Sequence, residues 1–351
     1  MDERAPIQMD GMVDFDPLRL RDFVAEHIDG DEGCLLGLQR IGGGQSNPTY
    51  ILRTKGRRMV LRKQPAGDIL KGAHAIDREY RVQAALAATA VPVPKPILFH
   101  DDPALLGTPF YLMEFLDGRV FSDCSLAGLA PEERRAIYFS MAETLAALHA
   151  VRPDAIGLGD YGRHGGYFER QVRRWSGQLE QSTGNPSPTL FHLRDWIGAN
   201  MPSDDGSVSI AHGDFRLGNL MFHPTEPHVV AVLDWELSTI GHPLADLGFC
   251  CLPWHTAPDE YGGILGLDQS VLAIPSEAEF VQRYREKLPD IGPMLPFHVA
   301  FALFRFAVIF VGIADRAAAG NAADPDAARL APLAARFAQR GLETAMRGMI
   351  R

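Results

Sequence analysis

Residues 212–219 read HGDFRLGN, and Asp234 follows fifteen residues later at the end of the apolar run 229–233. The octet has the form H-x-D-x-x-x-x-N. An isolated match occurs often by chance, because Asp and Asn in loops commonly stabilise turns. Here, however, short strands are expected on both sides, at 208–211 and 220–222, and the later Asp ends a third. This placement favours a catalytic loop over a simple turn.

The residue types in this segment suit phosphoryl transfer, which requires an aligned hydroxyl and neutralisation of developing charge. Asp214 would accept the proton of the acceptor hydroxyl, and Arg216 would stabilise the γ-phosphate electrostatically. Asn219 and Asp234 would supply oxygen ligands to Mg²⁺, a hard cation that prefers them. His212 is expected to hydrogen-bond the loop backbone and brace it. The catalytic candidates are therefore Asp214, Arg216, Asn219 and Asp234, of which the last two are also metal candidates.

The chain before residue 117 is rich in strand-like runs. Residues 1–15 are polar and expected to be loose, and Asp16-Pro17 is expected to open a short helix that ends near residue 28. Alternating patterns with glycine-rich turns then predict strands at 36–41, 49–54 and 58–64, a helix at 73–88, and strands at 97–100 and 110–115.

The chain after residue 117 is mostly helical in pattern, beginning with a strong amphipathic helix at 131–150. Further helices are expected at 166–181, 189–200, 243–252, 276–287, 296–316 and 325–349. The sequence therefore predicts an α+β, bilobal fold. We expect an N-terminal extension (1–32), a small β-rich N-lobe (33–116) and a larger helical C-lobe (117–351).

Composition narrows the classes of partner. Lys and Arg number 34 against 44 Asp and Glu, a net charge of −10, which disfavours nucleic acid and anionic membranes as partners. The four cysteines form no metal-binding pattern, which suggests a reducing, cytoplasmic location. The apolar stretch 297–314 is interrupted by His298 and Arg305 and is expected to be a buried helix rather than a membrane span.

These motifs resemble the aminoglycoside-phosphotransferase-like (APH) family, the small-molecule branch of the protein-kinase fold. H-G-D-x-x-x-x-N and the later LDWE (233–236) are its strongest marks. More narrowly, residues 43–47, 60–63, 74–80 and 234–249 resemble the kinase-like domain of long acyl-CoA-dehydrogenase-family proteins and its stand-alone bacterial relatives. The resemblance covers about residues 35–320, and it implies that the N-lobe binds ATP.

The resemblance implies a nucleotide site in three parts. The glycine-rich turn would approach the phosphates through Gly43, Gly44, Ser46 and Asn47, although a plain hairpin turn fits the same residues. The hinge would meet adenine through the backbone of Glu114, Phe115 and Leu116. Between them lies the strand 59–63, which carries two adjacent cations.

In protein kinases, a strand lysine contacts the phosphates and pairs with a helix glutamate. Strand alternation places Arg62 and Lys63 on opposite faces, and Arg62 falls at the expected position, with Glu79 as its predicted partner. Arginine keeps the charge of lysine but not its shape, so this is a departure from the usual pattern. In the family, an Asp at the position of Asp246 supports the catalytic loop.

The expected activity is ATP- and Mg²⁺-dependent phosphorylation of a small-molecule hydroxyl. The narrower resemblance implies a hydroxy acid or its coenzyme A thioester as acceptor. Arg170, Arg173 and Arg174 share a helix face that could receive a carboxylate, or that is simply solvated, and Trp254 and His255 are further candidates for the acceptor pocket.

Several alternatives stay open. An aminoglycoside or choline-like amino-alcohol kinase is one alternative. A polycationic aminoglycoside would need an acidic pocket, and the candidate C-lobe helices carry no dense acidic cluster. A protein kinase would need an activation segment, yet Asp246 follows Asp234 by only twelve residues. A nucleotide-binding pseudokinase is disfavoured by the intact Asp214, Asn219 and Asp234.

Overall fold

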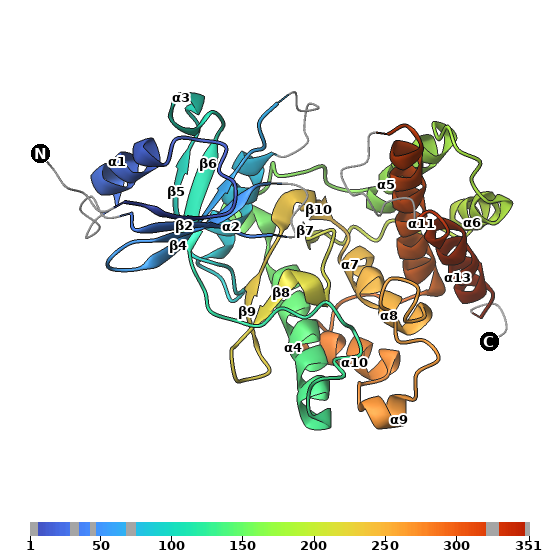
Figure 1. The fold of residues 1–351 in the computed structure, drawn as a ribbon. Coiled ribbons are helices and arrows are strands. Elements are labelled where there is room, and N and C mark those ends of the chain that lie inside the picture. Colours follow the sequence, from blue (N-terminus) through green and yellow to red (C-terminus); the bar gives the residue numbers. More distant parts are fainter. Residues whose placement is uncertain (1–5, 29–34, 43–46, 68–74, 321–329, 348–351) are drawn as a thin grey trace, which may run out of the picture. The chain divides into compact units, whose positions relative to one another are not determined.

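The computed structural model describes residues 6–28, 35–42, 47–67, 75–320 and 330–347 (Figure 1). The chain forms two compact units. The first comprises Met1–Asp117 together with Leu233–Glu236, and the second comprises Gly118–Val232 together with Leu237–Arg351. The short segment that contains Asp234 therefore belongs to the β-rich unit, although the strand before it belongs to the helical one.

The first unit is built on a six-stranded sheet with strand order β1-β2-β3-β4-β6-β5. Its strands are β1 (Gln8–Asp10), β2 (Gly37–Arg40), β3 (Thr49–Arg53), β4 (Arg58–Lys63), β5 (Pro96–His100) and β6 (Phe110–Glu114). All neighbours are antiparallel except β1, which pairs with β2 in parallel. The expectation that residues 1–15 are loose is therefore wrong for β1. Its three residues are exposed, so no burial pattern marks them as a strand.

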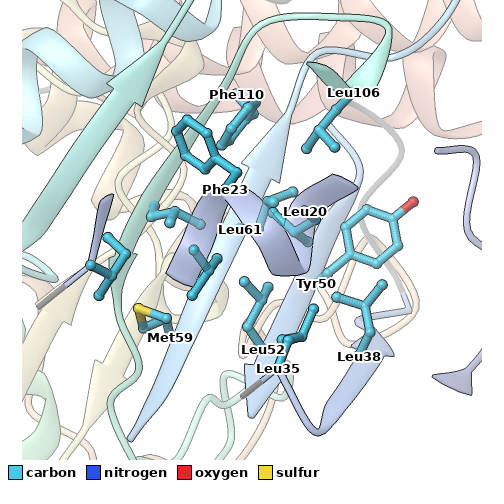
Figure 2. Packing of buried hydrophobic residues seen from close by; sticks show 13 residues of the cluster. Leu20, Phe23, Leu35, Leu38, Tyr50, Leu52, Met59, Leu61, Leu106 and Phe110 are labelled. Carbon is cyan, nitrogen blue, oxygen red and sulfur yellow. The ribbon is translucent and has the colours of Figure 1, made fainter. Parts of the chain in front are cut away.

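Three helices belong to the first unit: α1 (Pro17–His27), α2 (Ile76–Leu86) and the short α3 (Pro103–Leu106). The α1 helix begins as predicted, with the Asp16 side chain accepting from the Leu18 amide. Its apolar face, with Leu20 and Phe23, packs on Leu52 and Leu61 of the sheet (Figure 2). The predicted N-terminal extension thus contributes to the core of this unit.

The central strand β4 contributes to both faces of the sheet. Met59 and Leu61 lie in the cluster with α1, whereas Val60 packs with Ile76, the first residue of α2. Since side chains alternate along a strand, Arg62 is directed to the α2 face and Lys63 to the α1 face. This alternation decides the chemistry described below.

The second unit is mainly helical. Its helices are α4 (Pro131–Ala150), α5 (Tyr167–Glu180), α6 (Pro188–Ala199), α7 (Pro243–Cys250), α8 (Leu252–His255), α9 (Gln269–Leu272), α10 (Glu277–Lys287), α11 (Pro296–Ala318) and α13 (Leu333–Arg347). Short 3-10 turns occur at Pro153–Ile156, Leu217–Asn219 and Trp235–Leu237. Two small antiparallel ribbons pair β7 (Ser209–Ala211) with β10 (Thr239–Gly241), and β8 (Leu220–Phe222) with β9 (Val229–Val232). The β10 strand was not predicted.

Helix α11 forms the core of the second unit. It is long and apolar enough to cross a membrane, but 67% of its most apolar stretch is buried inside the structure. It packs against α5, α6, α7 and α13. Its approach to α7 is close at Gly248, where an added Cβ would lie 2.6 Å from the carbonyl oxygen of His298. The helix therefore behaves as the buried core helix that the sequence predicts.

Candidate active site

In the first unit, Arg62 joins two carboxylates that are far apart in sequence. Its Nε lies 2.7 Å from Glu79 Oε1, and its Nη2 lies 2.8 Å from Asp234 Oδ1. The first contact is an ion pair without hydrogen-bond alignment, whereas the second is a hydrogen bond. A planar guanidinium can bind two partners at once in this way, which a lysine ammonium does less specifically.

Lys63 points to the other face, where its Nζ lies 2.7 Å from Asp14 Oδ2 and its side chain is 1% exposed. The alternation predicted for this pair is therefore confirmed, and so is the pairing of Arg62 with Glu79. Because Lys63 is held by the segment before α1, it cannot replace Arg62 beside Glu79.

Glu79 is buried, with 1% of its surface exposed, so it is not a solvated surface carboxylate. Burial raises its pKa, and although the charge of Arg62 opposes this, the net direction is upward. Burial alone would lower the pKa of Arg62, but Glu79 and Asp234 raise it above the ordinary value. Arg62 therefore remains a cation.

Of the predicted glycine-rich turn, Gly43, Gly44 and Ser46 lie outside the described residues. Asn47 is buried, and its Nδ2 donates to Glu79 Oε2 at 3.2 Å. Its Oδ1 is also buried, with no hydrogen-bond partner in the described part of the chain. Asn47 thus orients Glu79 rather than projecting from an open turn.

The predicted hinge follows β6. The Glu114 amide donates to Lys95 O at 2.9 Å, so this N–H is not available to a ligand. Across the described ranges, no hydrogen bond from the Phe115 or Leu116 amide is seen. The Arg58 guanidinium packs over the Phe115 ring, with its Cζ 4.0 Å from the ring centroid. Within the part of the chain that is described, two of the three predicted hinge residues therefore have backbone N–H groups without a hydrogen-bond acceptor.

Asp234 adopts a left-handed backbone conformation, with φ of 63°. Non-glycine residues in this region carry strain and occur often at functional sites. The side chain is 35% exposed, and only Oδ1 is engaged, by Arg62. Within the described residues, Oδ2 has no hydrogen-bond donor, so it remains a hard oxygen ligand available to a cation.

In the second unit, the catalytic loop is fixed by a buried carboxylate. Asp246 of α7 accepts from the backbone amides of His212, at 2.6 Å, and Gly213, at 2.9 Å. From α11, Arg305 Nη2 donates to Gly213 O at 2.5 Å. Gly213 has φ of 84°, a conformation suited to glycine. His212 Nδ1 accepts from the Asp214 amide at 3.2 Å, and both His212 and Asp246 therefore brace the loop as the sequence analysis expected.

A polar chain extends behind Asp246. His149 Nε2 lies 3.4 Å from Asp246 Oδ2, and His149 Nδ1 lies 2.7 Å from the Tyr284 hydroxyl. Burial alone would raise the pKa of Asp246, but the hydrogen bond and charge of His149, together with the Gly213 amide, hold that pKa below its usual value. Asp246 is therefore ionised at neutral pH and can accept both backbone bonds.

The catalytic candidates themselves are in direct contact. Asn219 Nδ2 donates to Asp214 Oδ2 at 2.7 Å and to Asp214 O at 2.8 Å, and Arg216 Nε lies 3.3 Å from Oδ2. Asp214 Oδ1 receives no hydrogen bond from the residues that are described. One oxygen of Asp214 is thus held in place while the other is open to a hydroxyl.

The orientation of the Asn219 amide follows from its neighbours. Asp214 presents only acceptors, so Nδ2 must face it and Oδ1 must point away. Within the described ranges, that Oδ1 has no donor. Asn219 Oδ1 in the second unit and Asp234 Oδ2 in the first are therefore both oxygens of the kind that Mg²⁺ prefers. By its chemistry, each residue fits a ligand of the implied metal.

An apolar pocket of about 350 Å³ begins at the catalytic loop. Its walls come from the second unit alone: the loop itself (Arg216, Leu217, Gly218), α4, α7, α8, α11 and the loop after α8. Polar side chains are few, and Glu260 is the only acidic residue among those lining it. Both Glu260 oxygens are occupied, by Arg336, Arg340 and the Ala257 amide. The pocket therefore suits an apolar ligand body and offers no free carboxylate.

The other predicted acceptor residues do not line this pocket. Arg173 pairs with Glu169 on the surface of α5, Arg170 donates to Arg163 O, and Arg174 lies against Trp175. The Trp254 indole donates to Pro275 O, and His255 contacts Glu277 and Thr344. Glu260, Arg336 and Arg340 were not predicted from the sequence. Their ion pairs join residues about 80 positions apart, and no local pattern marks them.

A bilobal chain with this loop has the architecture of the kinase-like phosphotransferases, and comparison with known proteins agrees. The family described as "Phosphotransferase enzyme family" (APH) matches residues 37–286. A crystal structure from Ralstonia eutropha, described as a "putative aminoglycoside phosphotransferase", is 44% identical with a TM-score of 0.86. The match covers 95% of this chain and 99% of that one. The chain therefore belongs to the APH phosphotransferase family and is a phosphotransferase that acts on a small molecule.

Two longer proteins and one further solved structure are also similar to this chain. Human acyl-CoA dehydrogenase family member 11 is 39% identical over 95% of this chain, and Arabidopsis thaliana probable acyl-CoA dehydrogenase IBR3 is 41% identical over 90%. The chain spans only 43% and 41% of their respective lengths. Aminoglycoside phosphotransferase APH(4)-Ia, solved with AMP-PNP and hygromycin B, is 15% identical with a TM-score of 0.60. It shares the fold.

Proposed function

We propose that the protein transfers the γ-phosphate of ATP to the hydroxyl of a small apolar acid or its thioester, in a Mg²⁺-dependent reaction at a cytoplasmic location. The observation that carries this proposal is the state of Asp214. Its Oδ2 is fixed by Asn219 and Arg216, and its Oδ1 receives no hydrogen bond within the described ranges. A carboxylate held in this way can orient a hydroxyl and accept its proton.

The remaining roles follow from the same contacts. Arg62, held by Glu79, supplies fixed positive charge to the phosphates of the nucleotide. Arg216, whose side chain is 42% exposed, stabilises charge on the transferred group. Asn219 and Asp234 would hold Mg²⁺, which neutralises phosphate charge when bound. The free amides of Phe115 and Leu116 would receive the adenine edge.

The pocket supports an apolar and acidic acceptor. Its lining is mainly aliphatic and aromatic, and Arg216 at its catalytic end is a cation that suits a carboxylate. The long relatives are named as acyl-CoA dehydrogenase family members, which is consistent with an acyl acceptor. We therefore favour a hydroxy acid or its coenzyme A thioester.

An aminoglycoside acceptor is disfavoured by the same pocket. A polycationic ligand needs free carboxylates, and Glu260 already binds two guanidinium groups. The pseudokinase alternative is disfavoured because the open Asp214 oxygen is the group that catalysis requires.

The test is an ADP-release assay with Mg-ATP and a panel of hydroxy acids, their thioesters, choline-like alcohols, sugars and aminoglycosides. We expect activity with an acid or thioester, and a loss of at least about 100-fold in kcat in Asp214→Asn, with ATP binding retained. Activity confined to amino-alcohols or aminoglycosides would overturn the acceptor assignment. ATP binding without turnover on the whole panel would favour the pseudokinase.

A further inference from the structure

One wall of the apolar pocket is the loop of residues 257–265 after α8. This loop is held by its own backbone: Gly263 N donates to Ala257 O at 3.1 Å, and Leu265 N donates to Thr256 O at 2.8 Å. At Gly263, an added Cβ would lie 1.9 Å from the carbonyl oxygen of Thr256. The loop is therefore closely packed in one conformation.

Glu260 ties this loop to helix α13 near the C-terminal end of the chain. Its Oε1 accepts from Arg336 Nε at 2.9 Å and from Arg340 Nη2 at 3.1 Å. Its Oε2 accepts from Arg340 Nε and from the Ala257 amide. The Glu260 residue is 3% exposed, whereas the side chains of Arg336 and Arg340 are 37% and 25% exposed. A buried carboxylate is thus anchored by two arginines at the protein surface.

The residue after the anchor, Tyr261, lines the pocket and has two unusual properties. Its backbone is left-handed, with φ of 66°, a conformation that costs a non-glycine residue about 1–2 kcal/mol. The residue is 49% exposed, whereas Phe249 and Leu252, which also line the pocket, are buried. Tyr261 therefore lies at the solvent edge of the pocket.

The Tyr261 ring is held on its apolar side by α11. It packs edge-on against Phe306 at 5.1 Å and Phe310 at 5.4 Å, and Phe337 of α13 packs on the same two rings. The ring is thus packed by α11, and α13, the helix that binds Glu260, contacts the same two α11 rings. A strained, partly exposed aromatic that is packed against one helix suits a ligand-contacting role.

We propose that Tyr261 is the specificity-determining residue of this pocket and limits the length of the apolar chain that the acceptor can carry. Arg336 and Arg340 act through Glu260 as positioning residues for it. The proposal rests on the proposed function only in that the pocket receives the acceptor.

The test measures binding instead of turnover, so that it does not depend on the phosphoryl acceptor. Straight-chain carboxylates of about four to twelve carbons would be titrated by calorimetry into the full chain, with ATP-binding titrations alongside. We expect affinity to rise with chain length and then fall sharply in the native protein. In Tyr261→Ala this cutoff should move to longer chains, and the chains just long enough to reach the ring in the native protein should bind about tenfold more weakly for lack of the ring contact.

The conservative variant Tyr261→Phe should retain the native cutoff. Val271 is an exposed apolar residue on α9. The control variant Val271→Ala should leave both the cutoff and the affinities unchanged. Arg340→Lys should move the cutoff to longer chains, as Tyr261→Ala does, without changing the affinity for ATP. A general loss of stability would instead weaken the binding of both ligands.

Two results would overturn the inference: carboxylates that fail to bind the native protein, or a cutoff that is the same in Tyr261→Ala. Chain-length-selective binding without phosphorylation of any hydroxy acid would instead reject the proposed function and leave the role of Tyr261 standing.

Discussion

Arg62 and Asp234 are 172 residues apart in sequence, and they form a hydrogen bond of 2.8 Å inside the β-rich unit. The same guanidinium lies against Glu79. The strand cation and the proposed metal ligand are therefore partners in this structure. Any cation that binds Asp234 joins a network in which one carboxylate oxygen is already neutralised.

Arg62→Lys should raise the KM for ATP about tenfold, because an ammonium does not reproduce the forked contacts with two carboxylates. Steady-state kinetics at saturating acceptor would measure it. Lys63→Met is the matched control on the opposite face. It should leave the KM for ATP unchanged while lowering the free energy of unfolding, because Asp14 loses its buried partner. An equal rise in both variants would show that Arg62 is not the phosphate cation.

Asn219→Ala should raise the Mg²⁺ concentration needed for half-maximal activity by about tenfold or more, since it removes one proposed oxygen ligand and also frees Asp214 Oδ2. Activity would be measured across a Mg²⁺ titration at fixed ATP. Asn200→Ala, an exposed asparagine at the end of α6, should behave as the native protein. An unchanged titration in Asn219→Ala would remove it from the metal site.

Asp246→Asn should destabilise the fold by about 3 kcal/mol and lower kcat, because an amide presents a donor to backbone donors. The folded pKa of Asp246 is lowered, so its stabilisation is present above the unfolded pKa and is lost as pH falls through the folded one. In urea unfolding, the free energy of unfolding of the native protein should therefore decrease below about pH 4. This decrease should be smaller in Asp246→Asn. An equal decrease in both proteins would show that Asp246 is not the group with the lowered pKa.

His298 should make the fold sensitive to mild acid. Burial, with repulsion from His242, lowers its pKa to about 4. Between about pH 6.5 and 4 the unfolded chain binds a proton that the native state does not, so stability falls as pH falls, by up to about 3 kcal/mol.

His298→Gln keeps an acceptor for the Leu295 amide and should flatten this pH dependence in thermal or urea unfolding. His192→Gln, an exposed histidine on α6, is the control. A slope that is unchanged in His298→Gln would show that the depressed pKa has been assigned to the wrong residue.

Local patterns predicted most of the helices and strands, because the apolar period and the capping residues are written in neighbouring positions. The 131–150 helix and the Asp16 cap are examples. Strands β1 and β10 were missed, since each is three residues long and exists only through pairing with a distant strand.

In the candidate site, too, local features could be predicted and long-range contacts could not. The alternation of Arg62 and Lys63 is a property of one strand and could be read from it. The destination of Lys63, a carboxylate in the segment before α1, could not. The anchor at Glu260 was equally out of reach, because its partners lie on a helix about 80 residues away and their charges look like those of any solvated helix.

The contact at Gly248 gives the catalytic loop a mechanical dependence. Asp246 holds the amide of Gly213 from α7, and Arg305 holds its carbonyl from α11. At Gly248 the two helices leave no room for a methyl group. A side chain at this position would push α7 and α11 apart and weaken the two hydrogen bonds that hold Gly213. Gly248 therefore helps to fix the position of the proposed base, Asp214, although it has no side chain of its own.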